Sequence, residues 1–236
     1  MTILITGVSR GIGAQLAREL AKEGHKMVLI SRRKEDLLKV CSDCNTLAGK
    51  EIAIPMVYDL KMLESSREDF IAALKKHTSE LDCLVNNAGA LIRKPFQEIG
   101  IEESKNLFDV NFFAPVMLIQ AVLPLLKESD NASIVNVTSM AAFQGSSKFN
   151  GLSMYAASKG ALATLSECMA EEFKAFNIRV NSLAFGAVQT EMFAEAFPGY
   201  EASITAGEIG KFFSWFVQEG SKYFNGKMLP VSVSTP

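Results

Sequence analysis

Short apolar runs rich in β-branched residues alternate along the chain with longer segments in which apolar residues recur at helical spacing. In the first of the longer segments, Ile12–Glu23, the apolar positions 12, 16, 17 and 20 share one helical face. The apolar runs are continuous rather than alternating, which is typical of strands buried on both sides. We predict strands at Ile3–Thr6, Met27–Ile30, Ile52–Tyr58, Cys83–Asn86, Ser133–Thr138, Ile178–Leu183 and Met228–Val233.

The alternation of strand and helix predicts the fold. Repeated strand–helix–strand units give a parallel sheet with helices on both faces. Crossovers of this kind are right-handed, which makes a doubly wound sheet the leading topology. No repeat, low-complexity block or linker interrupts the 236 residues, so we predict an α/β fold with a seven-stranded sheet in a single domain, residues 1–236.

Composition narrows the class of protein. Hydrophobic residues make up 48% of the chain and charged residues 21%, as in ordinary soluble globular proteins. The net charge of −2 argues against a nucleic-acid-binding surface. The most apolar window, Phe112–Leu126, is too short to span a bilayer, and we interpret it as a buried or interface helix. Because the first residues show no basic leader, we expect a cytoplasmic protein with neither a membrane nor a nucleic-acid partner.

The cysteine pattern does not indicate a metal site. Cys41 and Cys44 form a lone Cys-x-x-Cys, and zinc would need two more ligands, whereas the two histidines are isolated. We interpret Cys83 and Cys168 as small core residues. We expect no metal and no disulfide framework.

A glycine-rich turn, Thr6–Gly13, joins the first predicted strand to the first predicted helix. Gly7, Gly11 and Gly13 let the backbone turn sharply and approach a ligand without Cβ clashes. Such a turn also aims free N–H groups and the positive end of the helix at an anion, here the pyrophosphate of a dinucleotide. A purely structural turn is the alternative, but the position between a first strand and a first helix favours nucleotide binding.

The residues after the second strand indicate which dinucleotide binds. In dinucleotide-binding folds this position meets the adenosine ribose, where an acid bonds the 2′-hydroxyl and an arginine accepts a 2′-phosphate. This chain has Ser31 and Arg32 there, with Arg10 of the glycine turn as a second cation. Two guanidiniums and a hydroxyl suit a phosphate dianion, although ordinary surface arginines are the alternative. We predict NADP(H) rather than NAD(H).

Polar and small residues follow three further strands, at the edge where open α/β sheets bind ligands. These residues are Asp59 and Leu60, Asn86–Gly89, and Thr138 and Ser139. Asn111 falls within the predicted helical stretch Ile101–Leu126, where a buried amide would need a partner.

An acid/base pair is predicted on the helix that opens at Met154–Gly160 and runs to about Phe176. Tyr155 and Lys159 lie four residues apart and therefore share a helical face. A phenol loses its proton near pH ~10, and a fixed ammonium beside it would lower that pKa. Alone, such a pair is a common surface coincidence, so its meaning depends on the other motifs.

Together, and in this order, these residues resemble the short-chain dehydrogenase/reductase family in its single-domain, Rossmann-like form. The resemblance spans nearly the whole chain, and no single motif carries it. The matching residues are the glycine turn Thr6–Gly13, Asp59, Asn86–Gly89, Asn111, Ser139, Tyr155, Lys159 and Asn181.

The resemblance implies four catalytic residues. Tyr155 would protonate the substrate oxygen during carbonyl reduction, or act as the base in the reverse direction. Lys159 would lower the pKa of the tyrosine and hold the nicotinamide ribose. Ser139 would polarise the carbonyl, and Asn111 would hold a water that links the lysine to solvent. The hydride would come from the nicotinamide ring.

The resemblance also implies the residues that bind the cofactor, NADP(H). They are Gly7, Ser9, Arg10, Gly11, Ile12, Gly13, Ser31, Arg32, Asp59, Leu60, Asn87, Ala88, Gly89, Tyr155, Lys159, Val188 and Thr190. Val188 and Thr190 would hold the carboxamide. Asp59, Leu60 and Asn87 would contact the adenosine side.

The chain departs from the family pattern in four places, two of them beside the predicted carbonyl site. Phe185-Gly186 replaces the usual Pro-Gly, which we interpret as a less constrained loop near the nicotinamide. The separation of Ser139 from Tyr155 is a few residues longer than usual, which makes the alignment of Ser139 less secure than that of Tyr155. We expect the extra residues, within 143–154, to shape substrate access.

The other two departures lie nearer the end of the chain. The segment between Thr190 and Gly207, where the variable substrate lid of the family falls, is short. Its apolar residues are Met192, Phe193, Phe197 and Tyr200. They indicate either an apolar portion of the substrate or a lid packed on its own domain. The stretch Asn225–Pro236 lacks the usual Asp-Gly-Gly, which puts the common C-terminal subunit contact in doubt.

These features predict a reductase that uses NADPH on a small-molecule ketone, aldehyde or 3-oxoacyl compound with an apolar portion. The alternative is an NADP-binding regulatory or scaffold protein without turnover, suggested by the altered residue Phe185 and the altered chain end. Family members usually pair through the helices that here contain Asn111 and Tyr155, so we predict a homodimer or homotetramer.

Overall fold

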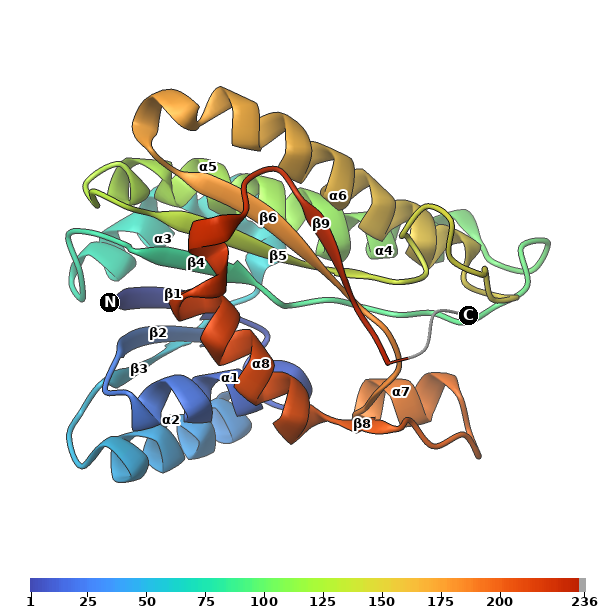
Figure 1. Ribbon diagram of the computed structural model, residues 1–236, viewed down its shortest axis with the longest axis horizontal. Helices are drawn as coiled ribbons and strands as arrows, with labels where there is room; N and C mark the ends of the chain where they lie inside the picture. The colour runs from blue at the N-terminus through green and yellow to red at the C-terminus, as the bar shows by residue number, and fades with distance from the viewer. Residues whose placement is uncertain (234–236) are drawn as a thin grey trace.

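A seven-stranded parallel sheet runs through the centre of the computed structural model, which describes residues 1–233 (Figure 1). The strands lie in the order β3-β2-β1-β4-β5-β6-β9. Their bounds are β1 Thr2–Thr6, β2 Lys26–Ser31, β3 Ala53–Val57, β4 Cys83–Asn86, β5 Ser133–Ser139, β6 Arg179–Phe185 and β9 Met228–Val231. The predicted doubly wound, Rossmann-like α/β sheet is confirmed, and each predicted strand is present to within two residues at either end.

Helices cover both faces of this sheet (Figure 1). Along β1, Ile3 and Ile5 face one hydrophobic cluster and Leu4 faces the other, because successive side chains of a strand point to opposite faces. The first face is covered by α1 Gly11–Lys22, α2 Lys34–Ala48 and α8 Ala206–Gln218. The second face is covered by α3 Leu63–Lys75, α4 Ile101–Phe108, α5 Ala114–Leu126 and α6 Ser153–Glu172. The inner strands β1, β2, β4, β5 and β6 are therefore buried on both sides, as their sequence predicts, whereas the edge strands β3 and β9 are partly exposed.

The carboxyl ends of the parallel strands meet at one edge of the sheet. β1 lies between β2 and β4, so the strand order changes direction at this point, where open α/β sheets form a crevice. Short elements lie beyond the same edge. Their bounds are β7 Val188–Gln189, α7 Glu191–Ala196 and β8 Ile204–Thr205, and β7 pairs with β8. In Figure 1, α7 lies past the end of β6 and outside the sheet.

The apolar stretch Ile101–Leu126 is one helical run with a defect inside it. α4 passes into a π-helical turn at Asp109–Phe113 and then into α5. By length and composition alone the run could cross a membrane, but half of its most apolar window is buried inside the protein. Leu118 and Val122 of α5 are fully buried in the second hydrophobic cluster. The run packs as a core helix does, which agrees with the buried alternative for Phe112–Leu126.

The interpretation of Phe185 as part of a loosened loop is wrong. β6 runs to Phe185, whose side chain is buried and packs edge-on against Phe213 with ring centres 5.5 Å apart. The carbonyl of Phe185 accepts a hydrogen bond from Met140 N (2.9 Å), and Gly186 N donates to Val231 O (3.0 Å). Sheet pairing therefore fixes this residue, because it extends the strand beyond its predicted end.

The interpretation of Cys168 as a core residue is also wrong. Cys168 is exposed, because the buried face of α6 passes through its neighbours Met169 and Ala170. Cys41 and Cys44 are buried instead, and burial raises the pKa of Cys41 to about 12. Among the described residues, no group of three or more His, Cys, Asp or Glu side chains could hold a metal ion.

Two predicted boundaries also shift near the end of the chain. α6 ends at Glu172 and is followed by a separate 3-10 turn, Lys174–Phe176, which closes in a left-handed Asn177. β9 ends at Val231, and residues 234–236 of the altered chain end lie outside the described residues.

Candidate active site

A cavity of about 650 Å³ lies at the carboxyl edge of the sheet. Nearly all of the residues predicted to bind the cofactor or to act in catalysis line it. These are Gly7, Ser9, Arg10, Gly11, Ile12, Ser31, Arg32, Asp59, Leu60, Asn87, Ala88, Gly89, Ser139, Tyr155, Lys159, Val188 and Thr190. Gly13 and Asn111 do not line the cavity and lie behind its wall. The roles of all these residues stay predictions, but the fold brings them to one place.

The glycine turn forms a tight cradle at one end of the cavity. Gly7 and Gly11 have φ angles of 71° and 60°, in the left-handed region that favours glycine. A Cβ at Gly13 would lie 2.4 Å from Asn87 Nδ2 and 2.5 Å from Gly7 O, so no larger residue fits there without movement of the backbone. The first turn of α1 has no side-chain cap and no acidic residue, and its N–H groups remain suited to an anion.

Asn87 braces this cradle from the end of β4. Its side-chain Nδ2 donates hydrogen bonds to Thr6 O and Gly7 O, each at 3.0 Å. In return, Thr6 Oγ1 accepts hydrogen bonds from the backbone N–H groups of Asn87 and Ala88, each at 3.0 Å. The loops after β1 and β4 are therefore held together by short polar contacts. We call the part of the cavity lined by the glycine turn and by the ends of β2, β3 and β4 the cofactor half.

Both arginines predicted to meet a phosphate have a carboxylate beside them. Arg32 Nη1 lies 3.7 Å from Asp59 Oδ2, and Arg10 Nη1 lies 3.1 Å from Glu195 Oε1 of α7. Both pairs are substantially exposed, and such pairs are worth little free energy. The carboxylates orient the two guanidiniums only weakly, so each guanidinium can leave its carboxylate and bind a phosphate.

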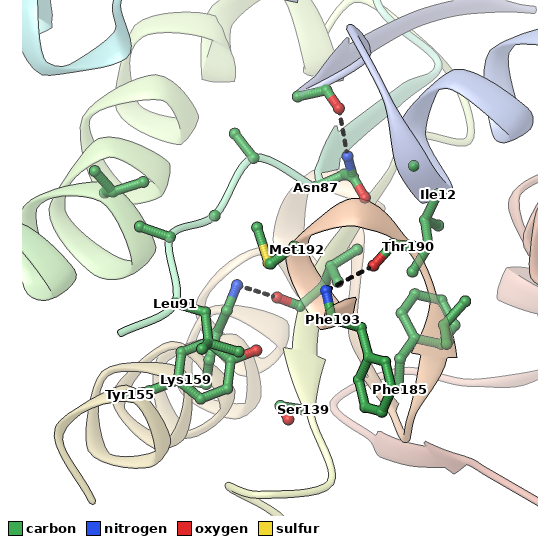
Figure 2. Close-up of a pocket in the computed structure, with 18 of the residues that line it drawn as sticks. Ile12, Asn87, Leu91, Ser139, Tyr155, Lys159, Phe185, Thr190, Met192 and Phe193 are labelled. Atoms are coloured by element: carbon green, nitrogen blue, oxygen red, sulfur yellow. Dashed lines mark hydrogen bonds between the residues drawn. The ribbon is translucent and has the colours of Figure 1, made fainter. Parts of the chain in front are cut away.

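Tyr155 and Lys159 project from the first turns of α6 toward the end of β5, where Ser139 lies (Figure 2). Lys159 Nζ donates a hydrogen bond to Val137 O at 2.8 Å. The lysine side chain is buried, and burial lowers its pKa to about 8. It is still a cation at neutral pH, because that value lies above 7.

The predicted lowering of the Tyr155 pKa by Lys159 is wrong for this arrangement. Burial raises the pKa of Tyr155, and a hydrogen bond with Ser139 opposes that rise. The desolvation of a phenolate inside the protein outweighs the effect of its neighbours. Tyr155 therefore keeps its proton at neutral pH, and the polar neighbour of its hydroxyl is Ser139.

Asn111 is fully buried in the π-helical turn, and all of its side-chain contacts are within the protein. Its Oδ1 accepts from Ala90 N (2.8 Å), and its Nδ2 donates to Ala90 O (2.9 Å). The same Nδ2 donates to Ser158 Oγ (3.0 Å), which in turn donates to Tyr155 O (2.7 Å). Asn111 thus has the partners that a buried amide needs, and it ties the loop after β4 to α6.

Ser158 is a residue that the sequence argument missed. It is fully buried and links Asn111 to the backbone of Tyr155. Its position directly before Lys159 is a signal that could have found it, because a hydroxyl on the buried face of a helix needs a partner.

A second buried polar chain anchors α6 to the sheet farther from the cavity. Asn86 Nδ2 donates to Asn136 Oδ1, and Asn136 Nδ2 donates to Ser166 Oγ, each at 2.8 Å. All three side chains are buried. Hydrogen bonds between buried groups are lost only at a high cost in free energy, so this chain fixes the position of α6 against β4 and β5.

Asn181, one of the residues that match the family pattern, lies outside the cavity. Its Nδ2 donates to Phe224 O (2.8 Å), and its Oδ1 accepts from Lys227 N (3.1 Å). These contacts hold the segment before β9 against β6. Its role in this structure is therefore to hold the edge strand β9 in place beside β6.

Three loops form the other half of the cavity, which we call the substrate half. The residues that line it are Leu91 and Arg93 after β4, Met140, Ala141, Phe149 and Leu152 between β5 and α6, and Met192, Phe193, Phe197, Tyr200 and Glu201 in and after α7. The predicted lid residues therefore face the cavity and also pack on one another, since the rings of Phe193 and Phe197 stack at 5.1 Å. Packing within the lid is therefore observed, and the apolar portion of the substrate stays a prediction. Arg93, Phe149 and Ser232, which also lines the cavity, had no motif that could have identified them.

Comparisons with known proteins agree with this geometry. The family profile described as short chain dehydrogenase matches residues 1–201. The ketoacyl reductase HetN of a Nostoc strain is 33% identical over 81% of this chain, and the match covers 65% of the length of that relative. The oxidoreductase YciK of Escherichia coli is 31% identical, over 95% of this chain and 88% of its own.

A solved structure matches the whole fold. It is a Shigella flexneri protein described as a putative short chain dehydrogenase and complexed with NADP. Its TM-score is 0.89 at 30% identity, and the match covers 97% of this chain and 95% of that one. The fold of this chain is thus shared with a protein whose structure was solved with NADP bound.

Proposed function

Because the chain belongs to the short chain dehydrogenase family, we propose that it is an NADP(H)-dependent oxidoreductase that reduces a carbonyl group to an alcohol. The observation that carries the proposal is the meeting of Tyr155 and Ser139 in the same cavity as the glycine cradle. A proton donor and a dinucleotide cradle in one enclosed space are what carbonyl reduction needs.

The cofactor fits the residues present. A Cβ at Gly13 would displace Asn87 or the backbone of Gly7, so the cradle is shaped for close approach to a ligand. Open N–H groups at the start of α1 suit the pyrophosphate, and Arg10, Ser31 and Arg32 line the same end of the cavity. When bound, the nicotinamide supplies the hydride.

The protein's own residues manage the proton. Since burial raises the pKa of Tyr155, its phenol is protonated at neutral pH and is suited to donate to the substrate oxygen. Ser139 lies in the same cavity as that phenol and is placed to bond the same oxygen and polarise the carbonyl. Lys159 uses one N–H on Val137 O, which leaves its other donors for the ribose hydroxyls and for a proton path.

One of the two observations that suggested an NADP-binding regulatory or scaffold protein without turnover no longer holds. It drew on a loosened loop at Phe185, and that residue is an ordered part of β6. Ser139, Tyr155 and Lys159 also line one cavity, and Lys159 and Asn111 are buried, an arrangement that a scaffold protein would not need.

The direct test is oxidation of NADPH by the purified chain with a panel of aliphatic, cyclic and aryl ketones, aldehydes and a 3-oxoacyl thioester. We expect saturable turnover of at least one class. Saturable NADPH binding without turnover of any member would establish the regulatory alternative.

The preference for NADPH is tested by Arg32→Asp. Loss of a charge-assisted contact and gain of a repulsive carboxylate should lower kcat/KM for NADPH by about 10- to 100-fold. The value for NADH should change by less than about threefold. Arg67→Asp, which makes the same charge change in α3 away from the cavity, is the control. If kcat/KM falls equally for NADPH and NADH, Arg32 does not contact the 2′-phosphate.

Assembly as a homodimer or homotetramer is a further part of the proposal. The helical run from α4 to α5 exposes large apolar side chains, with Ile101 at 68% and Phe113 at 49% exposure. Burial of this surface against a second copy would remove it from water. Light scattering gives the number of chains per particle, and a monomer would contradict this part alone. The cytoplasmic location stays a prediction.

A further inference from the structure

A cluster of aromatic rings centred on Phe197 lines the substrate half of the cavity, in the region that we call its mouth. Phe193 stacks on Phe197 with ring centres 5.1 Å apart and an interplanar angle of 25°. Phe149 and Tyr200 meet the same ring edge-on, each at 6.5 Å. The four rings come from the loop before α6, from α7 and from the segment after it. We call these four residues the aromatic cluster.

Arg93 completes the cluster from a third loop. Its guanidinium carbon lies 4.5 Å from the centre of the Phe197 ring, and its Nη1 donates to Ala196 O at 3.3 Å. The loop of Arg93 is tied to the loop before α6 by a hydrogen bond from Lys94 N to Gly151 O (2.9 Å). Gly151 has a φ of 83°, and a Cβ there would lie 3.1 Å from Arg93 Cγ, so a glycine allows the two loops to meet. Two separate loops are thus joined to each other and, through one ring, to the lid.

Between this mouth and Tyr155 the walls are apolar. Figure 2 shows Leu91, Met192 and Phe193 around the space in front of the tyrosine. The deeper residues Met140 and Leu152 are buried. Flat apolar rings gain most in such a space, because they meet aromatic faces and edges at favourable offset geometries.

The cations near the mouth are already engaged. Lys94 pairs with Glu103 at 3.0 Å, and Lys148 donates to Phe143 O (2.5 Å) within its own loop. Arg93 is held by Phe197 and Ala196, and the carboxylate of Glu201 lines the cavity. An acidic carrier protein needs a strongly basic surface at the entrance, and here the described cations share it with the carboxylates of Glu103 and Glu201, which lowers its positive charge.

From these contacts we propose the substrate class: a free, apolar, ring-containing ketone or aldehyde, selected by the aromatic cluster with Phe197 as the specificity-determining residue. A 3-oxoacyl group carried on an acidic protein is the class that the mouth disfavours. The proposal rests on the proposed function for its chemistry, but the recognition of the ring depends only on the substrate half.

The test uses three probes with the full chain and NADPH: 1-tetralone, 2-butanone and an acetoacetyl acyl-carrier protein. We expect kcat/KM for 1-tetralone to exceed that for 2-butanone by at least about 100-fold, since the fused ring buries far more apolar area. Turnover of the carrier-bound thioester should be the weakest of the three. A carrier-bound thioester that matches or exceeds 1-tetralone would overturn the proposal.

Phe197→Ala should lower the ratio of kcat/KM between 1-tetralone and 2-butanone by about tenfold, and Phe197→Tyr should restore it. The control is Phe96→Ala, which removes an exposed phenylalanine from the Arg93 loop outside the cavity. The dissociation constant for NADPH, measured by fluorescence, should match in all variants. A ratio unchanged by Phe197→Ala would also overturn the proposal.

Calorimetric binding of 1-tetralone to the NADP⁺-loaded protein separates this inference from the proposed function. If no ketone is reduced but 1-tetralone binds and Phe197→Ala weakens it about tenfold, the reductase proposal fails and the ligand class stands. If ketones are reduced without preference for rings, the reductase stands and the ligand class fails.

Discussion

The two halves of the cavity are held together by different kinds of contact. In the cofactor half, strand ends are joined by short hydrogen bonds such as those of Asn87 to Thr6 and Gly7. In the substrate half, three loops meet through the side chains of Phe197 and Arg93. The bonds of the first kind end on backbone atoms, whose positions follow from the fold, whereas contacts between two side chains change with a substitution at either residue. The first half therefore suits an invariant cofactor, and the second suits a substrate particular to this protein.

The proposed catalytic residues lie where the halves meet, and they share the construction of the cofactor half. α6 is bound to the rest of the fold by buried polar chains through Ser158 and Ser166. Proton transfer requires positions fixed to a fraction of an ångström, which buried hydrogen bonds provide. Changes at this boundary or in the cofactor half should act on chemistry and cofactor binding. Changes in the substrate half should act on selectivity.

The largest effect is expected from Tyr155→Phe, which removes one hydroxyl at the boundary. Loss of the proton donor should lower kcat by about 10²–10⁴-fold. The dissociation constant for NADPH should stay within about threefold, because the cofactor half is untouched. A variant with near-normal turnover would show that the proton comes from elsewhere.

Gly13→Ala should weaken cofactor binding and leave the substrate half unchanged. The added Cβ would lie 2.5 Å from Gly7 O, a backbone atom that cannot move aside cheaply. Overpacking of this kind costs about 1–3 kcal/mol, so NADPH affinity measured by calorimetry should fall by about 10- to 100-fold. Gly207→Ala, whose nearest atom would be 3.9 Å away, is the matched control and should bind normally. If both variants bind NADPH with equal affinity, the glycine turn does not form the cofactor site.

Lys159→Met should change stability and turnover in opposite directions. Since the folded pKa of about 8 lies below the ordinary 10.5, the cost of burying the charged lysine is fully present below pH 8. It is relieved as the pH rises from about 8 toward 10.5. We expect the variant to lose turnover and to gain on the order of 1 kcal/mol of stability at pH 7, after the loss of the bond to Val137 O is counted. Thermal unfolding at several pH values should show that this gain in stability shrinks above pH 8. A gain that grows with pH would contradict a lowered pKa of Lys159 in the folded protein.

The smallest effect concerns the ion pair between Arg10 and Glu195, which connects the glycine turn to α7. Glu195→Gln frees Arg10 for the phosphate of the cofactor. Because the pair is exposed, we expect NADPH to bind only about two- to threefold more tightly, with NADH unchanged. A similar gain for both cofactors would show that the pair acts on the lid and not on the phosphate.

The same contrast explains what could be predicted from the sequence. Periodicity and burial predict the strands, and glycines at a strand end predict the cradle, because these are local consequences of backbone geometry. Arg93 and Phe197 are 104 positions apart and meet only through tertiary packing, so no local pattern could pair them. The Tyr155 pKa was predicted in the wrong direction for a related reason. Helical spacing predicts the neighbour Lys159 but not the depth of burial, which is the larger effect.

The central claim is that this protein reduces a carbonyl group with hydride from NADPH. It is tested most directly with NADPH that carries deuterium at both positions of the nicotinamide C4. The purified chain is incubated with a ketone in ordinary water, and the alcohol is analysed by mass spectrometry. We predict one deuterium per alcohol molecule, on the carbinol carbon. An alcohol without deuterium, or NADPH that binds and is never oxidised, would contradict the account.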